Sequence, residues 1–392
     1  MSYSLSHIVI DTGLMDTQHI SSSTSPQLAV HRLDMAHPGD LSALQALLDH
    51  GVLAADEIVA IIGKTEGNGG VNDFTRGYFT QTLFNLLGDR LGRSPQQLQA
   101  EIPCILSGGT EGVLSPHYLV FARQAAAADA PAGPALAIGR ALSADTPAQD
   151  IGRWSHVQAV AQAVRAAMAD AGIDRAQDVA FVQVKCPCVT SARAQSAAAA
   201  GQPVRSADPN RSMAYARAAG AFGVALALGQ IADDDRLEAA LLEDFSLFCP
   251  QASISSGVEV SANEVVVLGH SATWRGPLRM ACEPMEDAVD LGAVVRACTR
   301  LGLQAHPQLP ASDLSRVAGV LVKCEPDRRG RVRGKRHTML DDTDINAQRH
   351  VRAALGGVVA GVLGTGQIFV SGGAEHQGPD GGGLIAIIAS IA

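Results

Sequence analysis

The chain has 392 residues, of which 47% are hydrophobic and 18% charged, and its formal net charge is −9 at pH 7. This length is sufficient for two or three domain-sized units with cores of their own. The acidic balance argues against a general nucleic-acid or membrane-surface binder. No stretch reaches the roughly 18 uninterrupted apolar residues that a transmembrane helix needs.

The first 27 residues are expected to form a flexible extension ahead of the folded part. They end in a stretch rich in serine and threonine, and they lack the basic and apolar regions of a signal peptide. The chain has 7 cysteines, an odd number spread over its length, which fits a reduced cytoplasmic protein better than a disulfide framework. Cys186 and Cys188 form a C-x-C pair without a second pair at zinc-ligand spacing, so we expect no zinc there.

Two glycine-rich stretches resemble nucleotide-binding loops but fail on spacing or context. In IIGKTEGNGG (61–70) the phosphate-loop motif would need a glycine where Ile58 stands. GVLGTGQ (361–367) runs into a strand-like segment instead of opening a helix. Nucleotide binding is therefore not expected, and Lys64 in the first stretch needs another explanation.

Internal repetition supplies that explanation. Three apolar, strand-like runs end in a lysine: EIVAIIGK at Lys64, DVAFVQVK at Lys185 and RVAGVLVK at Lys323. Each run follows a helix-like segment that is closed by glycine, the expected helix terminator. After each lysine come an arginine among small residues and then the motif S-x-G-x-E. The arginines are Arg76, Arg217 and Arg352, and the motif serines are Ser107, Ser255 and Ser371.

The repeat spacing predicts three domains instead of a solenoid. The lysines lie roughly 120 to 140 residues apart, whereas solenoid units run about 20 to 50 residues. Strand–helix–strand patterns with apolar strands indicate an α/β fold in which helices pack on sheets. We expect repeat units at 28–126, 135–272 and 278–392, separated by alanine-, glycine- and proline-containing linkers.

Three matched sets of lysine, arginine and serine indicate one site at a shared centre. Its natural ligand would be a small, flat, polar ring with near-threefold symmetry and several carbonyl oxygens. Arginine offers forked donors to such oxygens, and glycine near a serine lets backbone N–H groups approach a carbonyl. Lysine can replace histidine as the base of a serine if burial and neighbouring cations lower its pKa. Alternatively, the lysines and arginines form structural ion pairs with the glutamates.

Five segments closely resemble the cyanuric acid hydrolase/barbiturase family of ring-opening amidohydrolases. They are GKTEGNGGVNDFTR, LSGGTEGVLSPH, FVQVKCP, VRGKRHTMLDDTDIN and VSGGAEHQGPDGGG. The resemblance runs from about Leu28 to the C-terminus. It implies three homologous α/β repeat units in a pseudo-threefold, barrel-like assembly with one central active site. It also implies a homotetramer.

The resemblance implies that Ser255 is the nucleophile and Lys185 its base. It implies supporting roles for Lys64, Lys323, Ser107 and Ser371. The substrate-binding residues that it implies are Arg76, Ser107, Gly108, Arg217, Ser255, Ser256, Arg352, Ser371 and Gly372. Sequence symmetry alone does not choose among the three lysine–serine pairs. Ser256 sets the second motif apart, because the first and third have glycine there.

A structural Mg²⁺ or Ca²⁺, but no catalytic cofactor, is also implied by the resemblance. The implied ligands are Glu325, Ala374, Gln377, Gly378, Pro379 and Gly382. A set of oxygen ligands suits a hard cation. DTDIN (342–346) begins like a calcium loop, but Ala347 and Ala353 stand where an EF-hand needs glycine and glutamate.

The function favoured by the resemblance is hydrolysis of cyanuric acid to carboxybiuret, which then yields biuret and carbon dioxide. The close alternative is a barbiturase that opens barbituric acid to ureidomalonate, with Gln348 as a candidate discriminating residue. A non-catalytic binder of flat heterocycles and a purely structural assembly protein are alternatives from other classes. The expected partner is a small, flat, cyclic imide substrate, with neither nucleic acid nor membrane involved.

Overall fold

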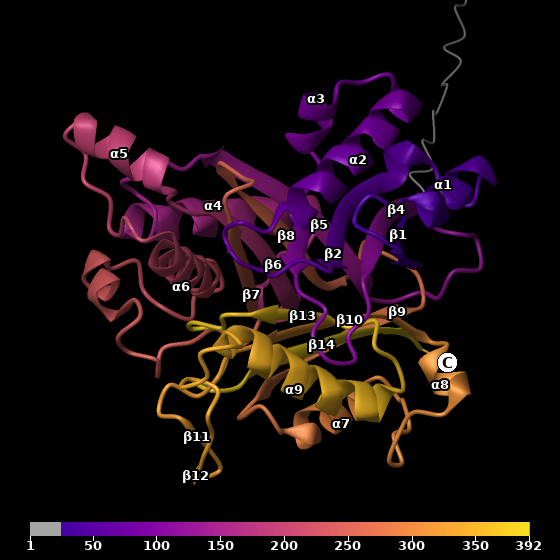
Figure 1. The fold of residues 1–392 in the computed structure, drawn as a ribbon. Helices are drawn as coiled ribbons and strands as arrows, with labels where there is room; N and C mark the ends of the chain where they lie inside the picture. The colour runs from indigo at the N-terminus through magenta and orange to yellow at the C-terminus, as the bar shows by residue number, and fades with distance from the viewer. Residues whose placement is uncertain (1–24, 392) are drawn as a thin grey trace, which may run out of the picture.

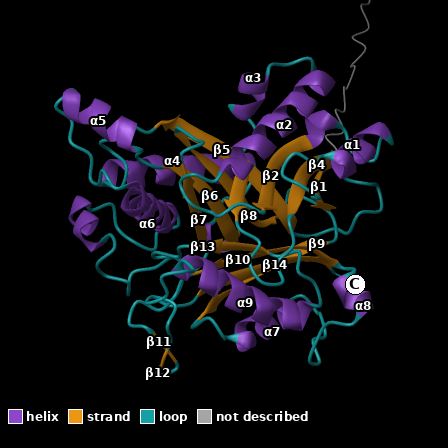
Figure 2. Cartoon of the chain, viewed as in Figure 1, coloured by secondary structure: helices purple, strands orange, loops and turns teal. Residues whose placement is uncertain are grey.

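The computed structural model describes residues 25–391, and its strands form three four-stranded sheets and one short hairpin (Figures 1 and 2). Residues 1–24, which make up most of the predicted extension 1–27, lie outside the described part. Within residues 25–391, no helix combines the length and apolar character needed to cross a membrane.

The first sheet has the strand order β1-β4-β2-β3. Strands β2 and β3 are parallel, and β4 is antiparallel to both of its neighbours. The strands are β1 (Pro26–Asp34), β2 (Ile58–Thr65), β3 (Cys104–Gly108) and β4 (His117–Ala125). Its helices are α1 (Ser42–Asp49), α2 (Phe74–Leu91) and α3 (Pro95–Gln99).

The second and third sheets repeat this order, as β5-β8-β6-β7 and β9-β14-β10-β13. The second comprises β5 (Ala135–Asp145), β6 (Val179–Pro187), β7 (Ala252–Gly257) and β8 (Ala262–Ser271), with α4 (Trp154–Asp170), α5 (Ser191–Ala199) and α6 (Pro209–Ala227). The third comprises β9 (Leu278–Met285), β10 (Val317–Cys324), β13 (Phe369–Gly372) and β14 (Gly383–Ser390), with α7 (Leu291–Arg300), α8 (Ala311–Leu314) and α9 (Ala347–Leu363). A hairpin of β11 (Arg331–Val332) and β12 (Lys335–Arg336) projects from the third unit (Figure 1).

The helices that carry the predicted arginines have defined starts. The Asp73 side chain caps α2 by accepting the Thr75 N–H, and Asp208 and Asn346 cap α6 and α9 in the same manner. Such caps satisfy N–H groups that the first turn of a helix leaves unpaired. Helix α9 ends at Gly364, which adopts φ +78°, a left-handed conformation that glycine accommodates without a steric penalty.

The three sheets meet in a common core. Strand β2 is buried along its whole length, and one hydrophobic cluster contains Ile62, Val184 and Leu321, one from each lysine-bearing strand. Helices α7 and α9 cover the third sheet, and α1, α2 and α3 lie together over the first (Figure 1). The fold class expected from the sequence, an α/β assembly of three repeated units around a centre, is confirmed. The closed arrangement places the ends of the three lysine strands near one another.

Candidate active site

Each lysine lies beside its own motif serine in the sheet. The central parallel strand pairs of the three sheets have equivalent register, so that the two residues are direct partners in every unit. The partner pairs are Lys64 with Ser107, Lys185 with Ser255, and Lys323 with Ser371. The repeated sequence motifs therefore adopt the same lysine–serine strand pairing in all three units.

One small cavity at the centre brings together the predicted substrate-binding residues. We call it the central cavity, and its lining comprises Arg76, Ser107, Gly108, Lys185, Arg217, Ser255, Ser256, Arg352, Ser371 and Gly372, together with Gly69, Leu106 and Met213. Lys64 and Lys323 are fully buried behind their serines. Sequence reasoning missed the last three lining residues. Gly69 belongs to a quoted motif and could have been found, whereas no repeated pattern marks Met213.

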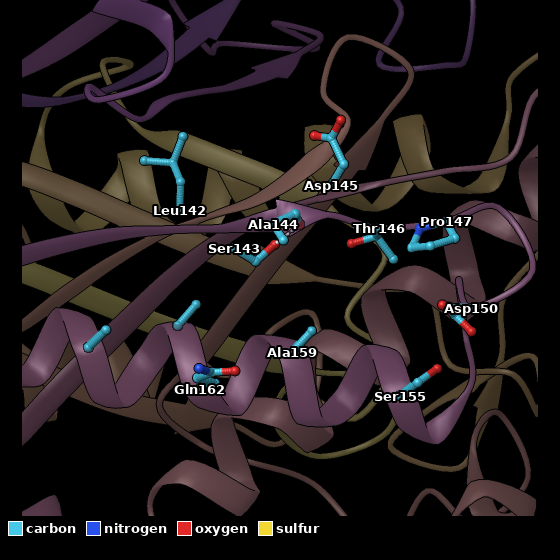
Figure 3. A pocket seen from close by; sticks show the side chains of 12 residues that line it. Leu142, Ser143, Ala144, Asp145, Thr146, Pro147, Asp150, Ser155, Ala159 and Gln162 are labelled. Carbon is cyan, nitrogen blue, oxygen red and sulfur yellow. Dashed lines mark hydrogen bonds between the residues drawn. The ribbon is translucent and has the colours of Figure 1, made fainter.

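Another groove, between the end of β5 and α4, contains none of the predicted residues (Figure 3). Its lining is largely small and apolar, and its charged side chains are Asp145 and Asp150. It offers neither a cation for carbonyl oxygens nor a nucleophile beside a base. The central cavity is therefore the candidate site.

The three lysines do not make equivalent contacts. Lys64 Nζ donates to Ser107 Oγ at 3.3 Å, and Lys323 Nζ donates to Ser371 Oγ at 2.9 Å. Lys185 Nζ instead lies 2.6 Å from Glu259 Oε1. The structure thus brings the supporting lysines to their serines, but it turns Lys185 away from Ser255 and toward a carboxylate.

Each lysine also reaches into another unit. The acceptor is in every case the carbonyl of the residue before a motif serine. Lys64 donates to the carbonyl of Val370, Lys185 to that of Leu106 at 3.2 Å, and Lys323 to that of Ile254. These bonds form a closed cycle through the three units, which fixes the position of the serine strands around the cavity.

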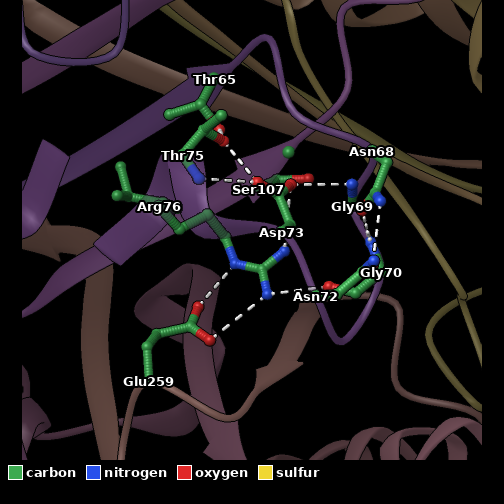
Figure 4. Close-up of polar contacts among 12 residues, drawn as sticks. Thr65, Asn68, Gly69, Gly70, Asn72, Asp73, Thr75, Arg76, Ser107 and Glu259 are labelled. Carbon is green, nitrogen blue, oxygen red and sulfur yellow. Dashed lines mark hydrogen bonds and ion pairs between the residues drawn. The ribbon is translucent and has the colours of Figure 1, made fainter. Parts of the chain in front are cut away.

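The arginines form a second cycle with the glutamates of the S-x-G-x-E motifs. Arg76 Nε lies 2.7 Å from Glu259 Oε1, and the guanidinium also contacts the Asp73 carboxylate (Figure 4). The other two pairs are Arg217 with Glu375 at 2.6 Å and Arg352 with Glu111 at 2.5 Å. Each pair joins two different units. The arginine–glutamate ion pairs of the alternative interpretation therefore exist, but the same three arginines also line the central cavity.

Burial sets the protonation of the lysines. It lowers the pKa of Lys64 well below its ordinary value, and the nearby Arg352 guanidinium lowers it further. Burial, assisted by Arg217, lowers the pKa of Lys323 to about 7. For Lys185 burial again lowers the pKa, but Glu259 opposes the shift. An amine without its proton can act as a base, so a lowered pKa is a requirement for the predicted chemistry.

Glu259 is ionised in this arrangement. Burial disfavours its charge, but Lys185 and Arg76 together hold its pKa at about 2. Its carboxylate therefore bridges the catalytic-lysine candidate and one substrate-facing arginine. The other two lysines bond to their serines instead, so this bridge distinguishes the second unit.

The predicted metal ligands lie around the loop between β13 and β14. Glu325 is buried, and its Oε1 accepts a hydrogen bond from Arg328 Nη2 at 2.6 Å. Burial raises the pKa of Glu325 to about 8, and the nearby Glu375 raises it further. The Gln377 side-chain oxygen is already used, since it accepts the Ile254 N–H. Among the described residues no cluster of three or more His, Cys, Asp or Glu side chains suits a metal.

The backbone of this loop can still present oxygen atoms. The carbonyls of Ala374, Pro379 and Gly382 each accept one backbone N–H, which leaves a second lone pair on each oxygen. With its pKa raised to about 8 by burial and by Glu375, Glu325 is protonated near pH 7, and a bound cation would favour its carboxylate form. One carboxylate with several carbonyls is a donor set that fits Mg²⁺ or Ca²⁺.

Known proteins resemble this chain over nearly its whole length. A family model described as amidohydrolase ring-opening protein matches residues 29–390. The cyanuric acid amidohydrolase of Azorhizobium caulinodans is 49% identical over 366 residues, which cover 93% of this chain and 99% of the relative. The corresponding protein of Enterobacter cloacae is 43% identical over 372 residues, 93% of this chain and 100% of the relative.

Solved structures agree with these matches. A cyanuric acid hydrolase structure, described as an innovation by structural concatenation, superimposes with a TM-score of 0.89 at 43% identity and covers 93% of this chain and 100% of its own. The structure of cyanuric acid hydrolase from A. caulinodans gives a TM-score of 0.86 at 48% identity and covers 94% and 100%. The family resemblance identified from the sequence motifs is thereby confirmed.

Proposed function

Because this chain belongs to the amidohydrolase ring-opening protein family, we propose that it is a cyanuric acid amidohydrolase. The observation that carries this proposal is the central cavity, where three serines, three arginines and three lysines surround one small space. Cyanuric acid has three equivalent ring carbonyls, so each unit can hold one of them. Relatives that are up to 49% identical and bear the name cyanuric acid amidohydrolase support the same substrate.

We assign the chemistry to Ser255 and Lys185. Lys185 Nζ takes the Ser255 proton, and Ser255 Oγ forms a bond to a ring carbonyl carbon. Arginine and backbone N–H donors around the cavity stabilise the tetrahedral oxyanion. The ring C–N bond then breaks, and the Lys185 ammonium returns the proton to the departing nitrogen. Water hydrolyses the acyl-enzyme to carboxybiuret, which loses carbon dioxide to give biuret.

The assignment requires Lys185 to exchange its partner during the cycle. In the structure its Nζ pairs with Glu259, yet Ser255 is its direct neighbour across the parallel strand pair. We propose that a change of side-chain rotamer brings Nζ toward Ser255 Oγ. Lys64 and Lys323 keep their serines oriented and serve the two carbonyls that do not react.

We also propose a structural Mg²⁺ or Ca²⁺ at Glu325 and the carbonyls of the 374–382 loop. When bound, the ion would supply positive charge to two buried carboxylates and would fix the loop behind Ser371. Arg328 supplies part of that charge in the present arrangement. Thermal unfolding with and without a chelator tests this proposal, and an unchanged melting temperature would contradict it.

A homotetramer located in the cytoplasm is our proposal for the assembled enzyme. The resemblance of the sequence motifs implies the tetramer, and the 7 cysteines are free in the structure, as a reducing compartment favours. Light scattering of the purified protein measures the mass directly. A particle much smaller than four chains of 40.6 kDa would contradict the tetramer.

The experiment that tests the function is ring opening of cyanuric acid and barbituric acid, measured in parallel by loss of ultraviolet absorbance. We expect turnover of cyanuric acid only. Turnover of barbituric acid only would keep the site and transfer the function to the barbiturase alternative. Tight binding of either ring without turnover would favour a non-catalytic binder instead.

A further inference from the structure

The three units differ at the residue that lies directly opposite each lysine. These positions are on β4, β8 and β14, the antiparallel neighbours of the lysine-bearing strands. They are His117 opposite Lys64, Glu264 opposite Lys185, and Leu384 opposite Lys323. Directly opposite residues of an antiparallel pair project from the same face of the sheet. Among these three positions, a carboxyl group therefore faces Lys185 and neither of the other lysines.

Glu264 is held in place from the first unit. Its side chain is buried, and Oε2 accepts the backbone N–H of Cys104 on β3 at 3.1 Å. Lys185 Nζ donates to the carbonyl of Leu106, two residues along the same strand. The two side chains therefore end against one stretch of β3.

A groove between α3 and the strands β5 and β8 reaches this carboxyl group from outside. Glu264 and Glu259 both line it, together with polar residues that include Gln96 and Gln99. The groove reaches Glu264 and Glu259, whereas Lys185 and Ser255 line the central cavity. Water in the groove can exchange a proton with Glu264 without passing the substrate.

The equivalent residues of the other units have no comparable chemistry. His117 Nδ1 lies 2.8 Å from the Ser115 carbonyl oxygen, and burial lowers the histidine pKa to about 4, so it stays neutral near pH 7. Leu384 is apolar and fully buried. The second unit thus has a carboxyl group opposite its lysine, where the other two units have a neutral histidine and a leucine.

We propose that Glu264 is a positioning residue that makes Lys185, and not Lys64 or Lys323, the working base of the site. When Lys185 takes the proton of Ser255, Glu264 gives its own proton to water in the groove, and its carboxylate then faces the new ammonium. When Lys185 gives its proton to the departing ring nitrogen, Glu264 takes one back from that water. The proton count closes over the cycle. This inference rests on the proposed function.

Electrostatics supports this sequence of events. Burial raises the pKa of Glu264 to about 8, whereas the Cys104 N–H and Lys185 act in the opposite direction. Glu264 is therefore protonated near pH 7, and a positive charge arriving on Lys185 favours its ionisation. The other titratable or charged groups that face this pair are Glu259, Arg76, Cys104, Cys186, Cys188 and Lys323.

The direction of the pH dependence follows from these charges. Above about pH 8, Glu264 is ionised before Lys185 receives a proton. The ammonium that Lys185 forms on taking the Ser255 proton then faces two carboxylates, Glu259 and Glu264, and returns that proton less readily to the departing ring nitrogen. The kcat of the wild type should therefore fall as the pH rises through about 8.

The test is Glu264→Gln, which keeps a side-chain oxygen for the Cys104 N–H but cannot ionise. We expect kcat near pH 7 to fall about 10- to 100-fold with KM nearly unchanged, since an opposite charge nearby shifts a pKa by one unit or more. The decline of kcat through about pH 8 should disappear in this variant. The matched control, His117→Gln, places the same side chain opposite Lys64 and should keep both kcat and the decline. Glu264→Asp keeps a carboxyl group and should restore the decline.

A second measurement does not depend on turnover. Glu264 and Glu325 both have pKa values of about 8, so the infrared carbonyl band of protonated Glu264 is obtained from the difference between the wild type and Glu264→Gln, and it should vanish as the pH of the unliganded proteins passes about 8. Absence of this difference band overturns the inference, and so does Glu264→Gln with wild-type kcat and pH profile. If the wild type opens neither ring, the proposed function fails, and the infrared result still decides whether Glu264 carries the proton.

Discussion

In the first and third units the lysine donates to its own serine, whereas in the second unit the lysine pairs with Glu259. The strand register is equivalent in all three, so this difference comes from side-chain contacts and not from the backbone. Lys64 and Lys323 behave as fixed donors that orient serine hydroxyls. Lys185 has a carboxylate partner and so is suited to gaining and losing a proton. In the mechanism that we propose, a symmetric framework binds a symmetric ring while one unit does the chemistry.

The largest effect should come from removing the lysines one at a time. Lys185→Met should lower kcat by about 10⁴-fold, because deleting the base of an activated serine removes most of the catalysis that depends on it. Lys64→Met and Lys323→Met should lower kcat less than Lys185→Met and should raise KM more, because these lysines orient groups that hold the substrate. Initial rates over a range of cyanuric acid concentrations separate the two outcomes. Equal losses of kcat in all three variants would remove the distinction between the units.

A second comparison sets the central ion pairs against a pair on the surface. Glu375→Gln leaves the buried Arg217 guanidinium without its carboxylate, which should cost about 3 to 5 kcal/mol of unfolding free energy. Asp178→Asn breaks the exposed pair with Arg175 and should change stability very little. Denaturant unfolding of both variants measures the difference. Similar losses would mean that the arginine–glutamate cycle does not hold the units together.

A smaller effect concerns stability and pH at Lys323. Its pKa is lowered from 10.5 in the unfolded chain to about 7 in the folded protein. Between these values the unfolded state holds a proton that the folded state does not, so stability should rise as the pH rises through this window. Lys323→Met cannot show this rise. The wild type should therefore gain stability relative to the variant between about pH 7 and pH 9, and a constant difference would show that Lys323 stays charged when folded.

Much of this arrangement could be predicted from repetition in the sequence. The recurring lysines and S-x-G-x-E motifs identified three units, and the sheets place Lys64 beside Ser107 as that repetition required. Lysine–glutamate ion pairs were one alternative for every unit, but the sequence could not predict that Lys185 pairs with Glu259 while the other two lysines bond to their serines. The motif is the same in all three units, and the choice of partner depends on distances between side chains. Met213 also lines the cavity without a counterpart in the repeats.

The sequence does contain a signal that distinguishes Glu264. From the residues opposite the three lysines, the strands that follow the motifs read HYLV, EVVV and LIAI. Aligning them would have revealed one acidic residue where the other units have histidine and leucine. What that residue faces still required the structure, because its partner Cys104 belongs to another unit.

Alanine substitution of each of the three serines determines which of them is the nucleophile. We predict that Ser255→Ala lowers kcat for cyanuric acid by at least about 10³-fold and leaves no acyl-enzyme in protein quenched during turnover and weighed by mass spectrometry. Ser107→Ala and Ser371→Ala should still form the acyl-enzyme at Ser255. Substantial activity in Ser255→Ala, or an acyl group on Ser107 or Ser371, would contradict the account.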